Sequence, residues 1–228
     1  LTNNSGVHSK KAGEYGLMSV LMLQNHIPKI ITNQKNKKFV SLFSNPIAGK
    51  TIVVVGTGSL GSSMIKLVAP LGANIIGVNR KGGMVEGCSK VVTTEKIDIV
   101  LPEADILYLA LPETPDTKNL INRKRLNLLK PSCGIVNIGR QSAIDYEALC
   151  EKLNNKELAG AILDVFTHEP IETSSKLWNT PNLVITPHVS SDDHGSYVKM
   201  TLDLFIKNLK LFISNKELVN QIDKDLGY

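Results

Sequence analysis

The chain has 228 residues and a formal net charge of +5, with 42% hydrophobic and 21% charged residues. These values are typical of a globular protein long enough for one large domain, or for one domain and part of another. The sequence also argues against a membrane and against nucleic acid as partners. Apolar stretches fall far short of the roughly 20 residues that a membrane helix needs, and the densest basic run, residues 33–39, is interpreted as a solvated loop rather than a nucleic-acid patch.

The cysteines and the start of the chain indicate its cellular context. Cys88, Cys133 and Cys150 form an odd set without the spacing of metal ligands, so we expect reduced thiols, no metal site and a cytoplasmic protein. Glu14 interrupts the only early apolar segment, which argues against a secretory signal. Because the first residue is Leu1 rather than Met, we expect a processed or partial form of something longer.

The first fifty residues predict a helix followed by a connector. Residues 6–25 contain helix-forming residues with apolar side chains at helical spacing. A polar segment rich in Lys and Asn follows, and it continues to Gly49. We therefore expect an interdomain or dimerisation helix and its connector over residues 1–50.

From Lys50 onward, short apolar runs alternate with amphipathic segments. Runs that are apolar at nearly every position are typical of strands buried on both faces of a parallel sheet, and helical patterns between them indicate βαβ units. The sequence therefore predicts an α/β fold with a doubly wound parallel sheet of the Rossmann type. The expected strands are residues 51–55, 74–78, 105–111, 134–138, 159–165 and 183–186.

Two further helices are expected in the second half of the chain. The stretch NRKRLNLLKPS, residues 122–132, reads as a helix closed by Pro131. The last forty residues contain a long helix that we expect to start near Ser190 or Ser191. Asp192 and Asp193 would then occupy its first turn, where a negative charge is favourable.

A glycine motif links the first expected strand to a helix. Gly56, Gly58 and Gly61 follow the strand in G-x-G-x-x-G spacing, the context of a dinucleotide fingerprint. Gly56 permits the sharp turn, Gly58 leaves room for a pyrophosphate, and Gly61 lets the helix pack closely on the strand. The helix then begins at Ser59 and Leu60, where free N–H groups suit phosphates. The alternative is a structural βα turn.

The end of the second expected strand bears on the choice of cofactor. An NAD site usually carries an acidic residue there, which bonds the ribose 2′-hydroxyl. Asn79, Arg80 and Lys81 occupy the place instead. Because cations suit a 2′-phosphate, the sequence favours NADP over NAD. The alternative interpretation is a solvent-exposed basic turn.

Polar side chains follow three later strands. Arg140 comes just past the strand in VNIGR, Asp164 ends the strand in GAILDVF, with Glu169 five residues later, and His188 follows the strand in NLVITPH. Ligands of open α/β sheets bind at the carboxyl ends of strands. Taken singly, each residue also fits an ordinary surface or loop position.

Together these stretches resemble the D-isomer-specific 2-hydroxyacid dehydrogenase family, most closely its glyoxylate/hydroxypyruvate reductase members. The matching segments run in family order almost from the first residue to the last. They are GVHSKKAGEYGL, GTGSLG, LALPETPDTKNLIN, LLKPSCGIVNIGR, DVFTHEP, LWNTPNLVITPH and LVNQIDKDLGY.

The resemblance implies a role for each member of the site. His188 would donate the proton to the substrate carbonyl, Glu169 would be its partner, and Arg140 would hold the carboxylate of a 2-oxo acid. Asp164 would contact the nicotinamide carboxamide. The implied cofactor-binding residues are Gly56, Gly58, Ser59, Leu60, Gly61, Asn79, Arg80, Lys81, Leu111, Pro112, Thr117, Ile138, Gly139, Arg140, Asp164, His188 and Ser190.

The resemblance also implies a division of the chain. Residues 51–188 would be the dinucleotide-binding domain and residues 189–228 a C-terminal helix returning toward a substrate lobe, most of which is missing from this chain. The expected function is hydride transfer between NADP(H) and a small 2-oxo or 2-hydroxy acid, in a homodimer formed through residues 6–43. The alternative is a catalytically weak, nucleotide-sensing interaction module of the corepressor type.

Overall fold

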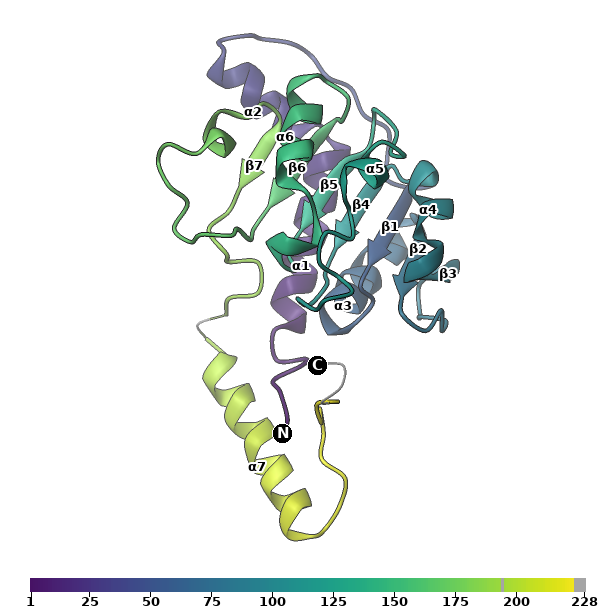
Figure 1. Ribbon diagram of the computed structural model, residues 1–228, viewed down its shortest axis with the longest axis vertical. Helices are drawn as coiled ribbons and strands as arrows, with labels where there is room; N and C mark the ends of the chain where they lie inside the picture. Colours follow the sequence, from purple (N-terminus) through teal and green to yellow (C-terminus); the bar gives the residue numbers. More distant parts are fainter. Residues whose placement is uncertain (194, 224–228) are drawn as a thin grey trace.

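The computed structural model describes residues 1–193 and 195–223 (Figure 1). His194 lies outside the described residues, and so do residues 224–228, the end of the expected C-terminal segment. The helices are α1 (Ser9–Gln24), α2 (Ile27–Lys35), α3 (Ser59–Val68), α4 (Ile97–Val100), α5 (Arg123–Leu126), α6 (Tyr146–Asn154) and α7 (Tyr197–Ile213). The strands are β1 (Thr51–Val55), β2 (Asn74–Asn79), β3 (Lys90–Thr93), β4 (Ile106–Leu109), β5 (Gly134–Asn137), β6 (Gly160–Leu163) and β7 (Leu183–Ile185).

The strands form one seven-stranded sheet in the order β3-β2-β1-β4-β5-β6-β7, and each neighbouring pair is parallel. The chain winds outward from β1 in one direction and then from β4 in the other. The strand order therefore reverses between β1 and β4, which confirms the doubly wound sheet. Loops that leave the carboxyl ends of all seven strands meet along one edge.

Two apolar cores cover the two faces of the sheet. On one face α1 and α3 pack on alternate residues of the strands, with Val20, Met64 and Ile65 fully buried. On the other face α4, α5 and α6 contribute, for example, Val100 and Leu149. Burial on both faces explains why the central strands are continuously apolar in sequence.

The expected connector after residue 25 contains a helix that the sequence analysis missed. α2 covers Ile27–Lys35, and Pro28 lies in its first turn, where the missing N–H group costs nothing. Its polar composition hid the helical pattern. The short edge strand β3 was missed as well, because its four residues, Lys90–Thr93, are only half buried or exposed.

The helix expected over residues 122–132 is much shorter than predicted. α5 ends at Leu126, well before Pro131. Leu126 and Leu129 both enter the core, and the chain then continues into β5. Lys130 precedes Pro131, a position at which helical backbone is disfavoured.

The prediction that the last helix begins near Ser190 was wrong, because α7 begins at Tyr197. Val189 and Ser190 donate their N–H groups to Asp164, which keeps this segment in a loop. The carboxylate of Asp193 then accepts the N–H groups of Gly195 and Ser196 in a local turn.

α7 lies away from the sheet, beside the two ends of the described chain (Figure 1). Thr2 and Gln221 form an antiparallel bridge, and Asn208 of α7 bonds the main chain of Val219 through both atoms of its amide. Large apolar side chains of α7, Phe205 and Phe212 among them, remain exposed. Among the described residues, the helices lack the combination of length and apolar character that spanning a membrane demands.

Candidate active site

The turn between β1 and α3 is built from glycines. Gly56 has a φ of +94°, a left-handed conformation that glycine adopts without strain. A Cβ on Gly56 would lie 2.6 Å from the carbonyl oxygen of Ala110, and a Cβ on Gly61 would lie 2.0 Å from that of Gly56. Side chains at both positions would therefore force α3 and the neighbouring loop away from β1.

Gly58 has the opposite surroundings, because a Cβ there would meet nothing within 4 Å. α3 begins at the next residue, Ser59, and Leu60 is its second residue. No side chain in the described ranges caps the N-terminus of α3. Free N–H groups and the positive end of the helix dipole therefore lie beside open space. These residues fit the pyrophosphate of a dinucleotide.

Asn79, the last residue of β2, organises the turn that follows. Its amide nitrogen donates to the hydroxyl of Thr57 at 3.0 Å, and its oxygen accepts the N–H groups of Lys81 and Gly82 at 3.1 and 2.7 Å. The amide thus joins the β2 turn to the glycine turn. The side chains of Arg80 and Lys81 are exposed there, at the place expected for a ribose phosphate.

The loop after β4 lies against the glycine turn, since a Cβ on Gly56 would lie 3.2 Å from the Leu111 side chain. The hydroxyl of Thr117 donates to the carbonyl oxygen of Pro112 at 2.7 Å, which folds the loop on itself. A Cβ on Gly139 would lie 2.6 Å from the main-chain nitrogen of Leu111, so the ends of β4 and β5 are in close contact. Ile138 is buried in the core beside this contact.

His188 and Glu169, which come from different strand ends, are in direct contact. Nδ1 of His188 lies 2.7 Å from Oε2 of Glu169. Oε1 of the same carboxylate accepts the N–H group of Phe166 at 2.7 Å. The imidazole is 45% exposed and the carboxylate side chain 34%, so a small ligand can reach the pair. Because the carboxylate engages Nδ1, Nε2 is the nitrogen that remains for proton exchange with a ligand.

The charges around Glu169 favour its ionised form. Partial burial acts to raise the pKa of Glu169, but hydrogen bonds from His188 and Phe166, together with the positive charges of His188 and Arg140, lower it below its ordinary value. Arg140 follows β5, and its guanidinium donates to the carbonyl oxygen of Gly139 at 2.8 Å. The three expected catalytic residues therefore share one electrostatic environment.

Asp164, directly after β6, fixes the loop that carries His188. Its fully buried carboxylate accepts the hydroxyl of Thr186 at 2.5 Å and the N–H groups of Val189 and Ser190 at 3.0 and 2.9 Å. Three donors satisfy the buried charge. The same bonds bracket His188, which has a φ of +54°, uncommon for a residue other than glycine.

The Asp164 network continues into α1. A carboxylate only accepts hydrogen bonds, so Thr186 donates to Asp164 and the hydroxyl of Tyr15 donates to Thr186, at 2.6 Å. Burial raises the pKa of Tyr15, which keeps this donor protonated. The helix expected between domains is thus bonded to the loop that carries His188.

Sequence reasoning located the charged residues of the site but missed the neutral ones that hold them. Thr186 and Tyr15 were assigned to a strand and a helix without a role. Asn137 and Tyr146 were also passed over, although Asn137 is a polar residue at the end of an otherwise apolar strand. The side chains of Asp164, Ile138 and Ser190 are buried. Their expected contacts with a cofactor stay predictions.

Residues 17–190 match the family model described as D-isomer specific 2-hydroxyacid dehydrogenase, NAD binding domain. The chain belongs to this family. The resemblance drawn from the motifs is therefore confirmed, and the sheet with its glycine turn is the nicotinamide dinucleotide-binding domain of the family.

Relatives of known name agree with the family. The chain is 32% identical to the glyoxylate reductase of Thermococcus litoralis over 79% of its own length and 54% of that protein. A D-isomer specific 2-hydroxyacid dehydrogenase from Xanthobacter autotrophicus, solved with NADPH and MES, superposes with a TM-score of 0.91 at 27% identity, covering 100% of this chain and 93% of that one. An NADPH-dependent glyoxylate/hydroxypyruvate reductase from Sinorhizobium meliloti, solved with NADP and sulfate, gives 0.87 at 26% identity, over 100% and 72%.

The chain spans about half the length of the curated relatives that it matches. What those relatives do as whole proteins therefore extends to this chain only as a proposal.

Proposed function

We propose that this protein takes part in the reduction of a small 2-oxo acid of the glyoxylate or hydroxypyruvate type, with NADP(H) as the preferred cofactor. The observation that carries the proposal is the contact between His188 and Glu169 at the carboxyl edge of a dinucleotide-binding sheet. An imidazole whose Nδ1 is held by a carboxylate has its Nε2 directed toward a ligand for general acid–base catalysis.

His188 acts in this proposal as the proton donor. Glu169 holds Nδ1 and fixes the orientation of the ring. Nε2 then delivers its proton to the carbonyl oxygen of the substrate, and Glu169 stays ionised throughout. The nicotinamide cofactor, when bound, supplies the hydride.

Arg140 binds the substrate in the same proposal. Its planar guanidinium offers two parallel donors to the substrate carboxylate, and its charge stabilises the oxygen that becomes negative as the carbonyl is reduced. The residues proposed to hold the cofactor are those of the glycine turn, the β2 turn, and the loops after β4, β5, β6 and β7. Asn79 is proposed to act through the turn that it organises, and Arg80 and Lys81 to receive the 2′-phosphate.

The test is the oxidation of NADPH, followed at 340 nm, with glyoxylate and with hydroxypyruvate. We expect turnover with at least one of them, and faster turnover with NADPH than with NADH. Binding of NADPH without reduction of either acid would contradict the proposal. The interaction-module alternative finds no support in the comparisons, where the named relatives are dehydrogenases and reductases.

We also propose that the protein is a homodimer formed through residues 6–43. The core face of α1 packs inside the domain, with Leu17 and Leu21 half buried, but the segment after it exposes Ile30, Phe39 and Phe43. Light scattering at micromolar concentration should give twice the mass of one chain, and a monomer would contradict this assignment. The cytoplasmic location stays a prediction, which fractionation of cells can test.

A further inference from the structure

A fully buried amide organises the strand end that carries Arg140. The side-chain oxygen of Asn137, the last residue of β5, accepts the N–H group of Gly139 at 3.0 Å. Its nitrogen donates to the carbonyl oxygen of Arg140 at 3.1 Å. The loop over residues 138–140 is thus folded around the Asn137 side chain, which fixes the backbone from which the Arg140 guanidinium extends.

The same amide reaches a second strand end through a tyrosine. Nδ2 of Asn137 also donates to the hydroxyl of Tyr146 at 3.1 Å, and that hydroxyl donates to the carbonyl oxygen of Val165 at 2.8 Å. The Tyr146 ring packs edge-to-face on Phe166, with centroids 6.1 Å apart. Phe166 in turn donates the N–H group that holds Glu169.

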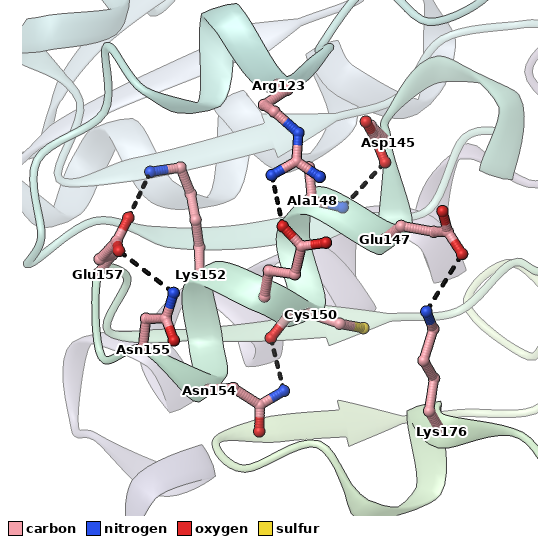
Figure 2. A network of polar contacts seen from close by, with 11 residues as sticks. Arg123, Asp145, Glu147, Ala148, Cys150, Lys152, Asn154, Asn155, Glu157 and Lys176 are labelled. Carbon is pink, nitrogen blue, oxygen red and sulfur yellow. Dashed lines mark hydrogen bonds and ion pairs between the residues drawn. The ribbon is translucent and has the colours of Figure 1, made fainter.

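Tyr146 is held firmly because it is the first residue of α6. Asp145 caps this helix by accepting the N–H group of Ala148 at 2.9 Å, and Arg123 and Lys176 pair with Glu151 and Glu147 on its outer surface (Figure 2). These contacts tie α6 to α5 and to the segment after the Glu169 loop. The hydroxyl of Tyr146 therefore bonds Val165 from a fixed position.

We propose that Asn137 and Tyr146 form a positioning pair that couples the substrate-binding Arg140 to the Glu169–His188 pair. The strands themselves are spaced by the sheet, whose last bond here runs from the N–H group of Asp164 to the carbonyl oxygen of Asn137 at 3.1 Å. Beyond that bond, one buried hydrogen-bonded path, from Gly139 and Arg140 through Asn137 and Tyr146 to Val165, joins the two loops, which share no direct side-chain bond among those described. The roles of the residues that the pair positions rest on the proposed function, but the hydrogen-bonded path itself can be tested without turnover.

The chain offers a matched pair of substitutions. Tyr146→Phe removes only the hydroxyl and keeps the ring against Phe166. Tyr108→Phe makes the same change at another buried tyrosine, in β4, whose hydroxyl has no hydrogen-bond partner within the described ranges. A second variant, Asn137→Ser, breaks the same path from its other end, because the shorter side chain does not span the distance to Tyr146.

The first measurement is the pKa of Glu169 in the full chain, followed by carbon-13 NMR of the side-chain carboxyl without cofactor. We expect Tyr146→Phe to raise the pKa of Glu169 by about 0.5, the effect of weakening one hydrogen bond to the carboxylate. Asn137→Ser should act in the same direction, and Tyr108→Phe should leave the titration unchanged. Wild-type titration of Glu169 in whichever of the two path variants folds would overturn the proposal.

The second measurement separates this inference from the proposed function. In a wild-type protein that reduces a 2-oxo acid, Tyr146→Phe should lower kcat about tenfold and leave the KM for NADPH unchanged. The loss should shrink when Glu169 is already Gln, since the hydroxyl acts through that carboxylate. If the wild-type protein reduces no 2-oxo acid, the proposed function fails, and the titration alone decides on the positioning pair.

Discussion

The two halves of the sheet build their part of the site in different ways. On the β1–β3 side the site is formed by the backbone: the glycine turn leaves open space beside Gly58, and the N-terminus of α3 has free N–H groups there. On the β5–β7 side, side chains do it: Asn137, Asp164 and Tyr146 are buried and hydrogen-bonded so that Arg140, Glu169 and His188 are held at the surface.

The contrast shows how each half would fail. On the β1–β3 side, larger side chains in the glycine turn should reduce stability or cofactor binding. The turn is either packed tightly against its neighbours or lies beside the space expected to hold the cofactor. On the β5–β7 side, the removal of a buried donor or acceptor should disturb the position of the charged residues, because its buried partner then loses a hydrogen bond. Cofactor binding and proton transfer should therefore respond to different substitutions.

The largest expected effect sharpens this separation. His188→Ala removes the proposed proton donor, and turnover should fall by about 100- to 10,000-fold, as for the loss of a general acid. The affinity for NADPH, measured by fluorescence titration, should stay close to that of the wild-type protein. An equal loss of cofactor affinity would mean that His188 holds the cofactor and that its role as proton donor is wrong.

Two neighbouring glycines should respond in opposite ways. Gly61→Ala places a Cβ 2.0 Å from a carbonyl oxygen and should destabilise the fold by about 1–3 kcal/mol or more. Gly58→Ala enters open space, so its urea midpoint should match the wild type while its NADPH affinity falls. Unchanged affinity in Gly58→Ala would show that the pyrophosphate does not approach this turn.

A smaller effect is expected at the β2 turn. Arg80→Asp replaces a cation by an anion where the 2′-phosphate is expected, and should weaken NADPH binding about tenfold. NADH lacks this phosphate, so its affinity should change much less. Parallel titrations with both cofactors check this, and equal losses would place the 2′-phosphate elsewhere.

The smallest expected effect concerns stability and pH. The pKa of Glu169 is lowered in the folded state, so its contribution to the free energy of unfolding is complete above its ordinary pKa and is lost as the pH falls through the depressed value. Solvent screening limits that contribution to about 0.5 kcal/mol. Urea midpoints of the wild type and Glu169→Gln should therefore differ slightly at neutral pH and converge in acid. A difference that grows in acid would contradict the sign.

The same contrast explains what could be predicted from the sequence. The strands around Val53, Val136 and Ile162, the glycine turn and the charged residues after the strands are local patterns, and they were placed correctly. The bond from Tyr146 to Val165 joins residues 19 positions apart and depends on how α6 packs, so no local pattern shows it. The predicted start of the last helix was wrong for a similar reason. Ser190 is held in a loop by a hydrogen bond to Asp164, which lies 26 positions earlier in the chain.

The central claim is that Arg140, Glu169 and His188 act together on one bound 2-oxo acid. A crystal structure of the protein with NADPH and oxalate, an unreactive analogue of such an acid, tests it most directly. We predict oxalate oxygens within about 3 Å of the Arg140 guanidinium and of Nε2 of His188, with Glu169 still on Nδ1. Oxalate bound to Arg140 with His188 turned toward solvent, or bound at another edge of the sheet, would contradict the account.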